Sequence, residues 1–338
     1  MSDDVLIVRG DEVSSLLAER ELEIIEVIRQ AYVAHARGQS SLPHSSFLRF
    51  PGDAANRIIA LPAFLGDGFS VAGLKWISSF PSNVRKGIAR ASAVLMLNSC
   101  ESGHVNAILE SSLISAKRTA ASAALAAQML TRGRAPRSVG LIGTGVINLE
   151  IARFLKAALA ISQVVLFDLD SDRARAFAAQ VRQSLEIETE IAASLEAVLG
   201  SSSLISFATT ATSPHVGDLS MCPAGATILH ISLRDLTPEV VLACDNVVDD
   251  PDHVCRAQTS LHLAEQLKGS REFIRCTLAD LCEGVAPPRV NDGKVSVFSP
   301  FGLGILDLAV GKLVFDSALA TGRGTLIKGF LPSMDGKV

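Results

Sequence analysis

The chain has 338 residues, of which 48% are hydrophobic and 20% charged, with a formal net charge of −4. This length is typical of about two domains, and the apolar fraction predicts a packed core rather than a disordered chain. The charges form no long block of one sign, which disfavours nucleic acid or an anionic membrane surface as a partner. No apolar run reaches the ~18 residues of a membrane helix, so we expect no membrane partner.

Cysteine and histidine spacing disfavours a metal site. The six cysteines form no CxxC pair, and the seven histidines include no HxxxH pair. The first residues lack the basic and apolar regions of a signal peptide. We therefore expect a cytoplasmic protein with reduced thiols and no bound metal.

The first third of the chain predicts one helix and a set of short strands. An apolar stripe with helical spacing runs over residues 21–36 and stops before Gly38. Pro and Gly punctuate the β-rich runs that follow, which predict a compact antiparallel sheet: Ser46–Phe50, Arg57–Leu61, Ser70–Ile77, Ser92–Leu97 and Val105–Leu109. The Ala-rich stretch from Ser111 to Leu130 contains no Pro or Gly and predicts one connecting helix.

From Ser138 the pattern changes to alternating strands and helices. This alternation predicts a parallel sheet with right-handed crossovers, with these strands: Val139–Ile142, Gln163–Phe167, Glu188–Ile191, Leu204–Ala208, Thr227–Ile231 and Asn246–Val248. A last helix is expected from Gly304 to Leu319. The fold class is therefore α/β, with a doubly wound Rossmann sheet and an additional α+β domain.

A glycine turn follows the first strand of the alternating region. The sequence Gly143-x-Gly145-x-x-Asn148 lies between the apolar strand Val139–Ile142 and an apolar-periodic helix. The first glycine permits a tight turn, and the second lets the backbone of the turn, with Val146, approach a pyrophosphate at the helix N-terminus. The third position is normally Gly or Ala, so Asn148 predicts a wider helix–strand contact.

An acidic residue stands where a dinucleotide ribose would lie. Asp168 ends the next strand, 23 residues after Gly145, and a carboxylate there accepts ribose hydroxyls and repels a 2′-phosphate. We therefore predict NAD rather than NADP. The alternative is that Asp168 only caps the following helix, for which Asp170 and Ser171 are equal candidates.

Four stretches resemble the ornithine cyclodeaminase/μ-crystallin family. They lie in the family's order over about residues 45–320 and are specific in combination: Gly73–Trp76, Glu110–Ala121, Ala208–Thr212 and Phe298–Asp307. The resemblance implies a substrate-binding and dimerisation domain over residues 1–125 with 305–338. It also implies an NAD-binding Rossmann domain over residues 126–304, and a homodimer.

Within that family, further stretches are similar to the siderophore-pathway dehydrogenases of N-(2-amino-2-carboxyethyl)-L-glutamate. They are Arg57–Pro62, Gly73–Ile77, Ala91–Asn98 and Ile231–Asp235. The resemblance implies NAD-dependent oxidation of the glutamate Cα–N bond and hydrolysis of the imine. The products would be 2-oxoglutarate and L-2,3-diaminopropionate.

The resemblance also implies roles for individual residues. Lys75, in an otherwise apolar strand, and Arg118, in an apolar helix, would bind the substrate carboxylate and take part in catalysis. Arg49 would bind substrate, and Arg57 competes for that position. Asp235 would take the place of the family's catalytic aspartate. Further cofactor contacts are predicted for Thr119, Thr209, Thr210, Ser232 and Ser299.

Each of these residues has a plainer interpretation. Lys75 could extend from a strand edge into water, and Arg118 could pair with Glu110 on a solvated helix face. Asp235 could cap the helix near Pro238, for which Thr237 competes. His230, within an apparent strand, is interpreted as a core histidine.

Three functions remain open from the sequence. The first is the glutamate-derivative oxidation. The second is another reaction of the family, namely ornithine cyclodeamination, ketimine reduction or alanine dehydrogenation. The third is a catalytically silent NAD-binding protein, against which the joint presence of Lys75, Arg118 and Asp235 argues.

Overall fold

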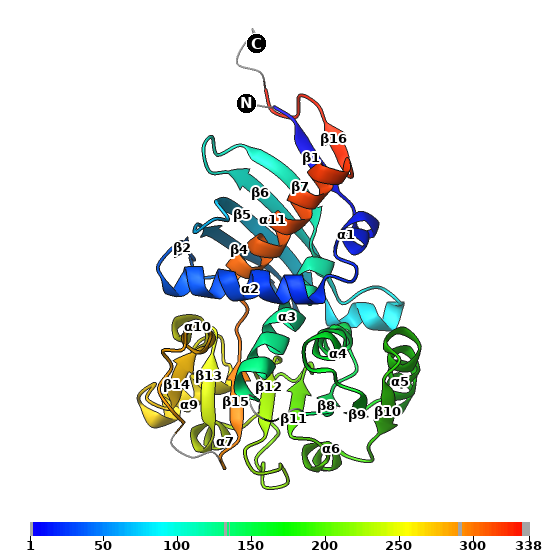
Figure 1. Cartoon of the computed structure of the whole chain (residues 1–338), viewed down its shortest axis with the longest axis vertical. Coiled ribbons are helices and arrows are strands. Elements are labelled where there is room, and N and C mark those ends of the chain that lie inside the picture. Colours follow the sequence, from blue (N-terminus) through cyan, green and yellow to red (C-terminus); the bar gives the residue numbers. More distant parts are fainter. Residues whose placement is uncertain (1–2, 132–133, 135, 290–292, 333–338) are drawn as a thin grey trace. The chain divides into compact units, whose positions relative to one another are not determined.

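The computed structural model describes residues 3–131, 134, 136–289 and 293–332. Its chain divides into two compact units, residues 1–118 with 303–338 and residues 119–302 (Figure 1). The boundaries predicted from sequence lie at 125/126 and 304/305, and the division by contacts lies at 118/119 and 302/303. Residues 1–2 and 333–338 of the predicted first domain lie outside the described residues.

The first unit is built on an eight-stranded, mostly antiparallel sheet. Its path of neighbouring strands, with β3 (Ser46–Phe50) paired to β4 beside it, is β16 (Thr325–Ile327), β1 (Val5–Val8), β7 (Val105–Glu110), β6 (Ala91–Ser99), β5 (Val71–Ser79), β4 (Asp53–Leu65) and β2 (Ser40–Ser41). The one parallel pair among these described strands is β1 with β7. The strands predicted from alternation are confirmed, and β4 and β5 extend beyond their predicted ends.

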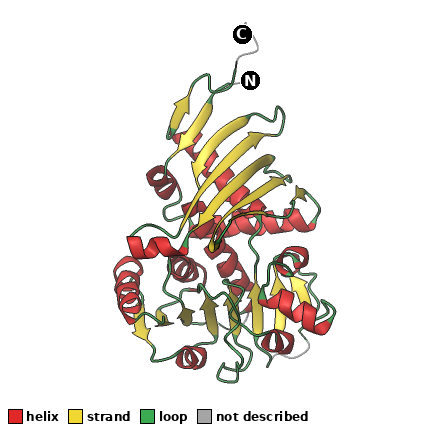
Figure 2. Cartoon of the chain, turned by 180° about the vertical axis from the view of Figure 1, so that it is seen from behind, coloured by secondary structure: helices red, strands yellow, loops and turns green. Residues whose placement is uncertain are grey.

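Helices cover one face of this sheet. Both views show two long helices crossing it on the same side (Figures 1 and 2). The helices of this unit are α1 (Gly10–Leu16), α2 (Glu21–Ala36), the 3₁₀ turn η1 (Pro81–Lys86) and α11 (Gly304–Thr321). Helix α11 lies against β4, β5 and β6, and α2 lies against α11. Successive residues of a strand alternate between faces, so odd-numbered positions of β5 face α11.

Two glycines bring α11 close to the sheet. A Cβ atom at Gly73 would lie 2.2 Å from the carbonyl oxygen of Met96 and 2.8 Å from Leu308 Cδ2. A Cβ atom at Gly311 would lie 2.3 Å from Leu95 Cδ2. Since real side-chain atoms do not approach so closely, only glycine permits this contact between β5, β6 and α11. The contact fixes which side chains of α11 lie next to those of β5.

The second unit is built on an eight-stranded sheet whose described pairs are all parallel. Its order is β10 (Glu188–Ile191), β9 (Gln163–Phe167), β8 (Ser138–Ile142), β11 (Leu204–Phe207), β12 (Thr227–His230), β15 (Ser296–Ser299), β13 (Asp245–Val248) and β14 (Ile274–Thr277). The chain reverses direction across the sheet between β8 and β11. This is the topological switch point of a Rossmann sheet, where ligands bind at the carboxyl ends of strands. The predicted fold class is confirmed.

Helices connect these strands. They are α4 (Val146–Leu159), α5 (Ser171–Leu185), α6 (Leu195–Ser201), α7 (Pro238–Ala243), α8 (Pro251–Val254), α9 (Ser260–Lys268) and α10 (Leu278–Glu283). Helix α3 (Ser112–Leu130) begins in the first unit and continues into the second. None of the helices that the structure describes is long and apolar enough to cross a membrane.

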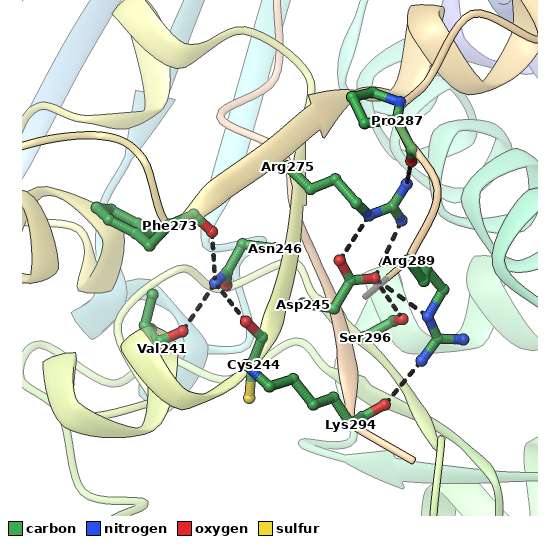
Figure 3. A network of polar contacts seen from close by, with 10 residues as sticks. All are labelled: Val241, Cys244, Asp245, Asn246, Phe273, Arg275, Pro287, Arg289, Lys294 and Ser296. Carbon is green, nitrogen blue, oxygen red and sulfur yellow. Dashed lines mark hydrogen bonds and ion pairs between the residues drawn. The ribbon is translucent and has the colours of Figure 1, made fainter. Parts of the chain in front are cut away.

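A polar network joins the amino ends of β13 and β15 to β14 (Figure 3). Asp245 accepts hydrogen bonds from Arg275 at 2.6 and 3.0 Å and from Ser296 at 2.9 Å. The Arg289 guanidinium lies 3.5 Å from the same carboxylate. Arg275 and Arg289 are themselves held by backbone carbonyls, and Asn246 donates to three more. Because this network lies at the edge opposite to the carboxyl ends, its role is structural.

We predict that Asp245→Asn destabilises the protein. The carboxylate is 9% exposed and the Arg275 side chain 11%, and removing one partner of a buried ion pair costs on the order of 3 kcal/mol. Urea unfolding measures this loss. The control is Asp252→Asn, whose carboxylate pairs with Arg271 at 2.6 Å but is 79% exposed, and we expect at most about 1 kcal/mol there. Equal effects of the two variants would contradict this role.

Candidate functional site

The glycine turn after β8 leaves open space at the N-terminus of α4. Gly143 has φ +90°, and a Cβ atom there would lie 2.7 Å from the Ala208 carbonyl oxygen. Gly145 is the N-cap residue of α4, no side chain caps this helix end, and nothing lies within 4 Å of its virtual Cβ. Val146 follows and is 64% exposed. The free N–H groups of this first turn can therefore bind an anion such as a diphosphate.

Asn148 joins the turn to the sheet. Its amide donates to the carbonyl oxygens of Ile142 at 3.0 Å and Gly143 at 2.6 Å, and its Oδ1 accepts from Ser206 Oγ at 2.8 Å. The residue is fully buried. Asn148 thus joins helix α4 to β8 and β11 by hydrogen bonds, whereas Gly or Ala at this position would let the backbones pack closely.

Asp168 is held at the carboxyl end of β9. Its Oδ2 accepts from the Thr144 N–H at 2.9 Å and the Thr144 hydroxyl at 2.6 Å, and its Oδ1 accepts from the Asp170 N–H at 3.0 Å. Burial opposes ionisation, but these hydrogen bonds outweigh it and lower the pKa of Asp168. Helix α5 is capped by Asp170 instead. The capping interpretation of Asp168 is therefore wrong.

Asp235 is a fully buried carboxylate in the loop after β12. Its Oδ1 accepts from the Thr209 hydroxyl at 2.5 Å, and its Oδ2 accepts from the Ser232 hydroxyl. Burial raises the pKa of Asp235, but His230 and the two hydroxyls outweigh it, so that the pKa lies below its ordinary value. Helix α7 is capped by Thr237, so the capping interpretation of Asp235 is wrong as well.

His230 is joined to Asp235 and Ser299. Its Nε2 accepts from the Asp235 N–H at 3.2 Å and lies 3.3 Å from Asp235 Oδ2, and its Nδ1 lies 3.1 Å from Ser299 Oγ. The ring is fully buried, as a core histidine is, but it also positions the Asp235 loop.

The other predicted cofactor residues lie at separate places. Thr209 and Ser232 bind Asp235, whereas Thr210 is exposed. Ser299 is buried at the end of β15. Thr119 is half-buried on α3. Their contact with a cofactor stays a prediction.

In the first unit, Lys75 is a buried cation paired with a buried anion. Its side chain is 2% exposed, and its Nζ donates to Asp307 Oδ2 at 2.6 Å and to Ser115 Oγ at 3.2 Å. Burial lowers the pKa of Lys75 to about 8, with Asp307 raising it and Arg118 lowering it further. The interpretation of Lys75 as a strand-edge lysine that reaches water is therefore wrong.

Arg118 joins the same cluster. Its Nε donates to Asp307 Oδ1 at 3.2 Å and its Nη2 to Ser115 Oγ at 3.3 Å, and its side chain is 11% exposed. Glu110 is not its partner, because that carboxylate caps the start of α3 through Ser112 and Leu113. Arg118 is thus part of a buried site and not of a solvated helix face.

The cluster of Lys75, Arg118 and Asp307 has two positive charges and one negative charge when all three groups are ionised. A buried net positive charge is costly unless an anion compensates it. Lys75 can donate a third hydrogen bond, and Arg118 Nη1 makes none within the described part of the chain. The cluster can therefore bind a carboxylate.

Sequence reasoning missed Asp307, Ser115 and the role of His230. Asp307 lies in the first turn of helix α11. An acid at this position is ordinarily explained by its favourable interaction with the helix dipole. The partners of Asp307 are 189 and 232 positions away in the chain. A signal was present all the same, because a carboxylate within the apolar run that begins this helix, residues 304–311, needs a buried partner.

Arg49 and Arg57 lie outside this cluster. They are opposite each other on β3 and β4. Arg49 is exposed and Arg57 half-buried, and the Cζ atom of Arg49 lies 5.7 Å from the centroid of the Phe47 ring. Substrate binding by either arginine stays a prediction.

Comparison with known proteins identifies the relatives of this chain. An N-((2S)-2-amino-2-carboxyethyl)-L-glutamate dehydrogenase of Staphylococcus aureus is 27% identical over 97% of this chain and 99% of its own length. The solved structure of a Thermococcus litoralis Δ1-pyrroline-2-carboxylate reductase, with NADH and L-proline, is 25% identical. It superimposes with a TM-score of 0.88 over 95% of this chain and 99% of that one.

A third relative is an archaeal alanine dehydrogenase dimer with bound NAD. It is 26% identical, with a TM-score of 0.85 over 96% of this chain and 99% of that one. The model of the ornithine cyclodeaminase/mu-crystallin family matches residues 7–322. The chain therefore belongs to the ornithine cyclodeaminase/mu-crystallin family.

Proposed function

We propose that the protein is an NAD-dependent amino-acid dehydrogenase that oxidises N-(2-amino-2-carboxyethyl)-L-glutamate. The glutamate Cα–N bond is oxidised to an imine, and water then releases 2-oxoglutarate and L-2,3-diaminopropionate. The observation that carries the proposal is the buried cluster of Lys75, Arg118 and Asp307, with its uncompensated positive charge. The Staphylococcus aureus relative, which matches over nearly the whole length of both chains, supports this substrate.

The turn after β8 fits a dinucleotide. Open space lies before Gly145 at an uncapped helix N-terminus, and the ionised Asp168 is fixed at the end of the next strand. Asp168 would accept the ribose hydroxyls of NAD and repel the 2′-phosphate of NADP. When bound, NAD supplies the acceptor of a hydride.

Lys75 and Arg118 bind the carboxylate next to the reacting carbon. Asp307 holds both cations, so they are oriented before the substrate arrives. Fixing a reactant in this way removes several kcal/mol from a barrier, and up to roughly 7–11 in the best intramolecular reactions.

Asp235 receives a proton. Its lowered pKa keeps it ionised at neutral pH, so it accepts hydrogen bonds and does not donate them. The Thr209 and Ser232 hydroxyls fix both oxygens and leave lone pairs on each. A carboxylate in this state can take the amine proton and then orient the water that adds to the imine carbon.

The reaction assay separates this proposal from the other family reactions. We expect NAD and N-(2-amino-2-carboxyethyl)-L-glutamate to give NADH and 2-oxoglutarate in equal amounts, with a lower kcat/KM for NADP. Absorbance at the nicotinamide band follows the first product, and mass spectrometry identifies the second. A cyclodeaminase returns its hydride and accumulates no NADH.

Three outcomes would reject the proposed substrate. Proline and ammonia from ornithine, with no NADH from the glutamate derivative, would assign cyclodeamination. NADH and pyruvate from alanine, with none from the glutamate derivative, would assign alanine dehydrogenation. No turnover of any of these, and no oxidation of NADH with a cyclic ketimine, by a protein that binds NAD would assign a silent NAD-binding protein.

The uncovered face of the first sheet supports a homodimer. Register places four apolar side chains on the face away from α11, each 37–42% exposed: Leu48, Phe64, Trp76 and Val94. Figure 2 shows this face with no helix of the described first unit across it. An apolar patch of this kind marks an interface.

We predict that Trp76→Glu converts a dimer to a monomer. A carboxylate buried at an apolar interface loses its hydration. Sedimentation equilibrium at micromolar concentration gives the mass, and Leu22→Glu, at a residue 59% exposed on α2, is the control. A wild-type monomer, or a dimer unaffected by Trp76→Glu, would contradict this interface.

A further inference from the structure

Two arginines, Arg49 and Arg57, lie near one end of the sheet face that bears Lys75, and a third, Arg90, lies in the turn next to that end. Arg49 is opposite Arg57, Arg57 is opposite Ser79 on β5, and Ser79 is opposite Ala91 on β6. The residue before Ala91 is Arg90, whose carbonyl oxygen accepts from the Phe80 N–H at 2.8 Å. Directly opposed residues project to the same face, and so do alternate residues of one strand. Arg57 and Ser79 therefore lie on the same face of the sheet as Lys75. Lys75 precedes Ser79 by four residues on β5.

Within the described residues, none of these three guanidinium groups pairs with a carboxylate. Arg57 and Arg90 also make no side-chain hydrogen bond there. They instead face like charges, since Arg49 lies directly opposite Arg57. Burial and the neighbouring Arg49 lower the pKa of Arg57, and burial and Arg57 lower that of Arg90. Like charges opposite each other destabilise a sheet. An anion that binds between them would remove this repulsion.

The sequence around them is strongly basic. Residues 45–95 contain two carboxylates, Asp53 and Asp67, against six cations: Arg49, Arg57, Lys75, Arg85, Lys86 and Arg90. The segment thus has a net charge of +4 in a chain whose total is −4. This asymmetry favours anionic ligands and repels cationic ones.

Ser79 is an independent sign of a ligand. Its side chain is buried, with 7% exposure, and its Oγ has no hydrogen-bond partner within the described residues. Ser78, the preceding residue, projects to the other face and pairs with Ser92. A buried hydroxyl without a partner is costly. On the same register row as Arg57, it can donate to the anion that the arginines attract.

We propose that Arg57, Arg90 and Ser79 form a second carboxylate subsite, separate from the Lys75–Arg118 cluster, which binds the distal carboxylate of an amino-acid substrate with two or more carboxylates. This inference rests on the proposed function and names its substrate class. The backbones of Lys75 and Ser79 are ~13 Å apart along the strand, and long side chains from both ends shorten that span. A glutamate-like molecule can then reach from one subsite to the other.

The subsite also selects against the alternative substrates. Alanine and proline have one carboxylate and leave the arginines uncompensated. Ornithine would bring its second ammonium group toward three guanidinium groups, which is repulsive. Specificity thus comes from both attraction of one class and rejection of the other.

Binding of two matched keto acids tests the subsite without turnover. The probes are 2-oxoglutarate and 2-oxopentanoate, which have the same chain length and differ in the distal carboxylate. Isothermal titration is done with the full chain in the presence of NADH. We expect the wild type to bind 2-oxoglutarate at least about tenfold more tightly, since each charged hydrogen bond contributes about a factor of ten or more.

Variants then locate the preference. Arg57→Gln and Arg90→Gln should each reduce the ratio of the two affinities by about tenfold, and Ser79→Ala should reduce it less. The affinity for 2-oxopentanoate should not change. Arg57→Lys should restore part of the ratio, because it restores the charge. Arg29→Gln, which removes a cation paired with Glu26 on α2, is the control for net charge and should leave the ratio unchanged.

The outcomes separate the subsite from the proposed reaction. Equal affinity of the wild type for both keto acids, or an unchanged ratio in Arg57→Gln and Arg90→Gln, would overturn the subsite even if the glutamate derivative is oxidised. Loss of the ratio in both variants supports the subsite even if that substrate is not turned over. Circular dichroism of each variant checks the fold, and Arg90, which lies outside the strands, remains informative if Arg57→Gln does not fold.

Discussion

The buried carboxylate of Asp307, held between Lys75 and Arg118, is the contact on which the first unit depends. Its two partners come from β5 and α3, and it lies on α11, so one residue ties three segments distant in sequence. Burying these charges is costly, and breaking such a group by removing one partner typically costs about 3–5 kcal/mol. The close packing of α11 at Gly73 and Gly311 brings the carboxylate to the level of Lys75. The packing of the sheet and the chemistry of the site are therefore set by the same helix.

The second unit holds its buried carboxylate with hydroxyl groups and a histidine ring. Asp235 is as deeply buried as Asp307, but hydroxyl groups and the His230 ring surround it. Hydroxyl donors keep a carboxylate ionised without bringing in a second full charge. The first arrangement has spare positive charge and suits the binding of an anion. The second has spare lone pairs and suits the acceptance of a proton.

Local patterns made much of the second unit predictable. The strand, the turn at Gly143 and Gly145, and the strand that ends at Asp168 lie within about 30 consecutive residues. The short strands β1, β2, β14, β15 and β16, of two to four residues each, were not predicted. β15 in particular pairs between β12 and β13, out of chain order, which no local pattern indicates.

Contacts over long distances in sequence explain what the residues alone could not show. Arg118 has an acid, Glu110, two helical turns away, and the sequence offered it as partner. The structure instead places Asp307 there and uses Glu110 as a cap. Ser79 and Arg90 gave no signal by themselves, since a serine in a strand and an arginine before one are ordinary. Their meaning comes from the pairing of β4, β5 and β6, which sets Ser79 opposite Arg57 and Arg90 next to the end of β6.

The titration of Lys75 tests the central claim most directly, namely that the buried cluster has positive charge to spare for a carboxylate. Side-chain ¹⁵N NMR of Lys75, with and without 2-oxoglutarate, measures its pKa. The structure predicts a pKa of about 8 in the free protein, because burial outweighs the attraction of Asp307. Bound carboxylate should raise this pKa, so affinity should be constant below about pH 8 and fall as the pH increases further. A pKa near 10.5 that is unaffected by the ligand would contradict the account.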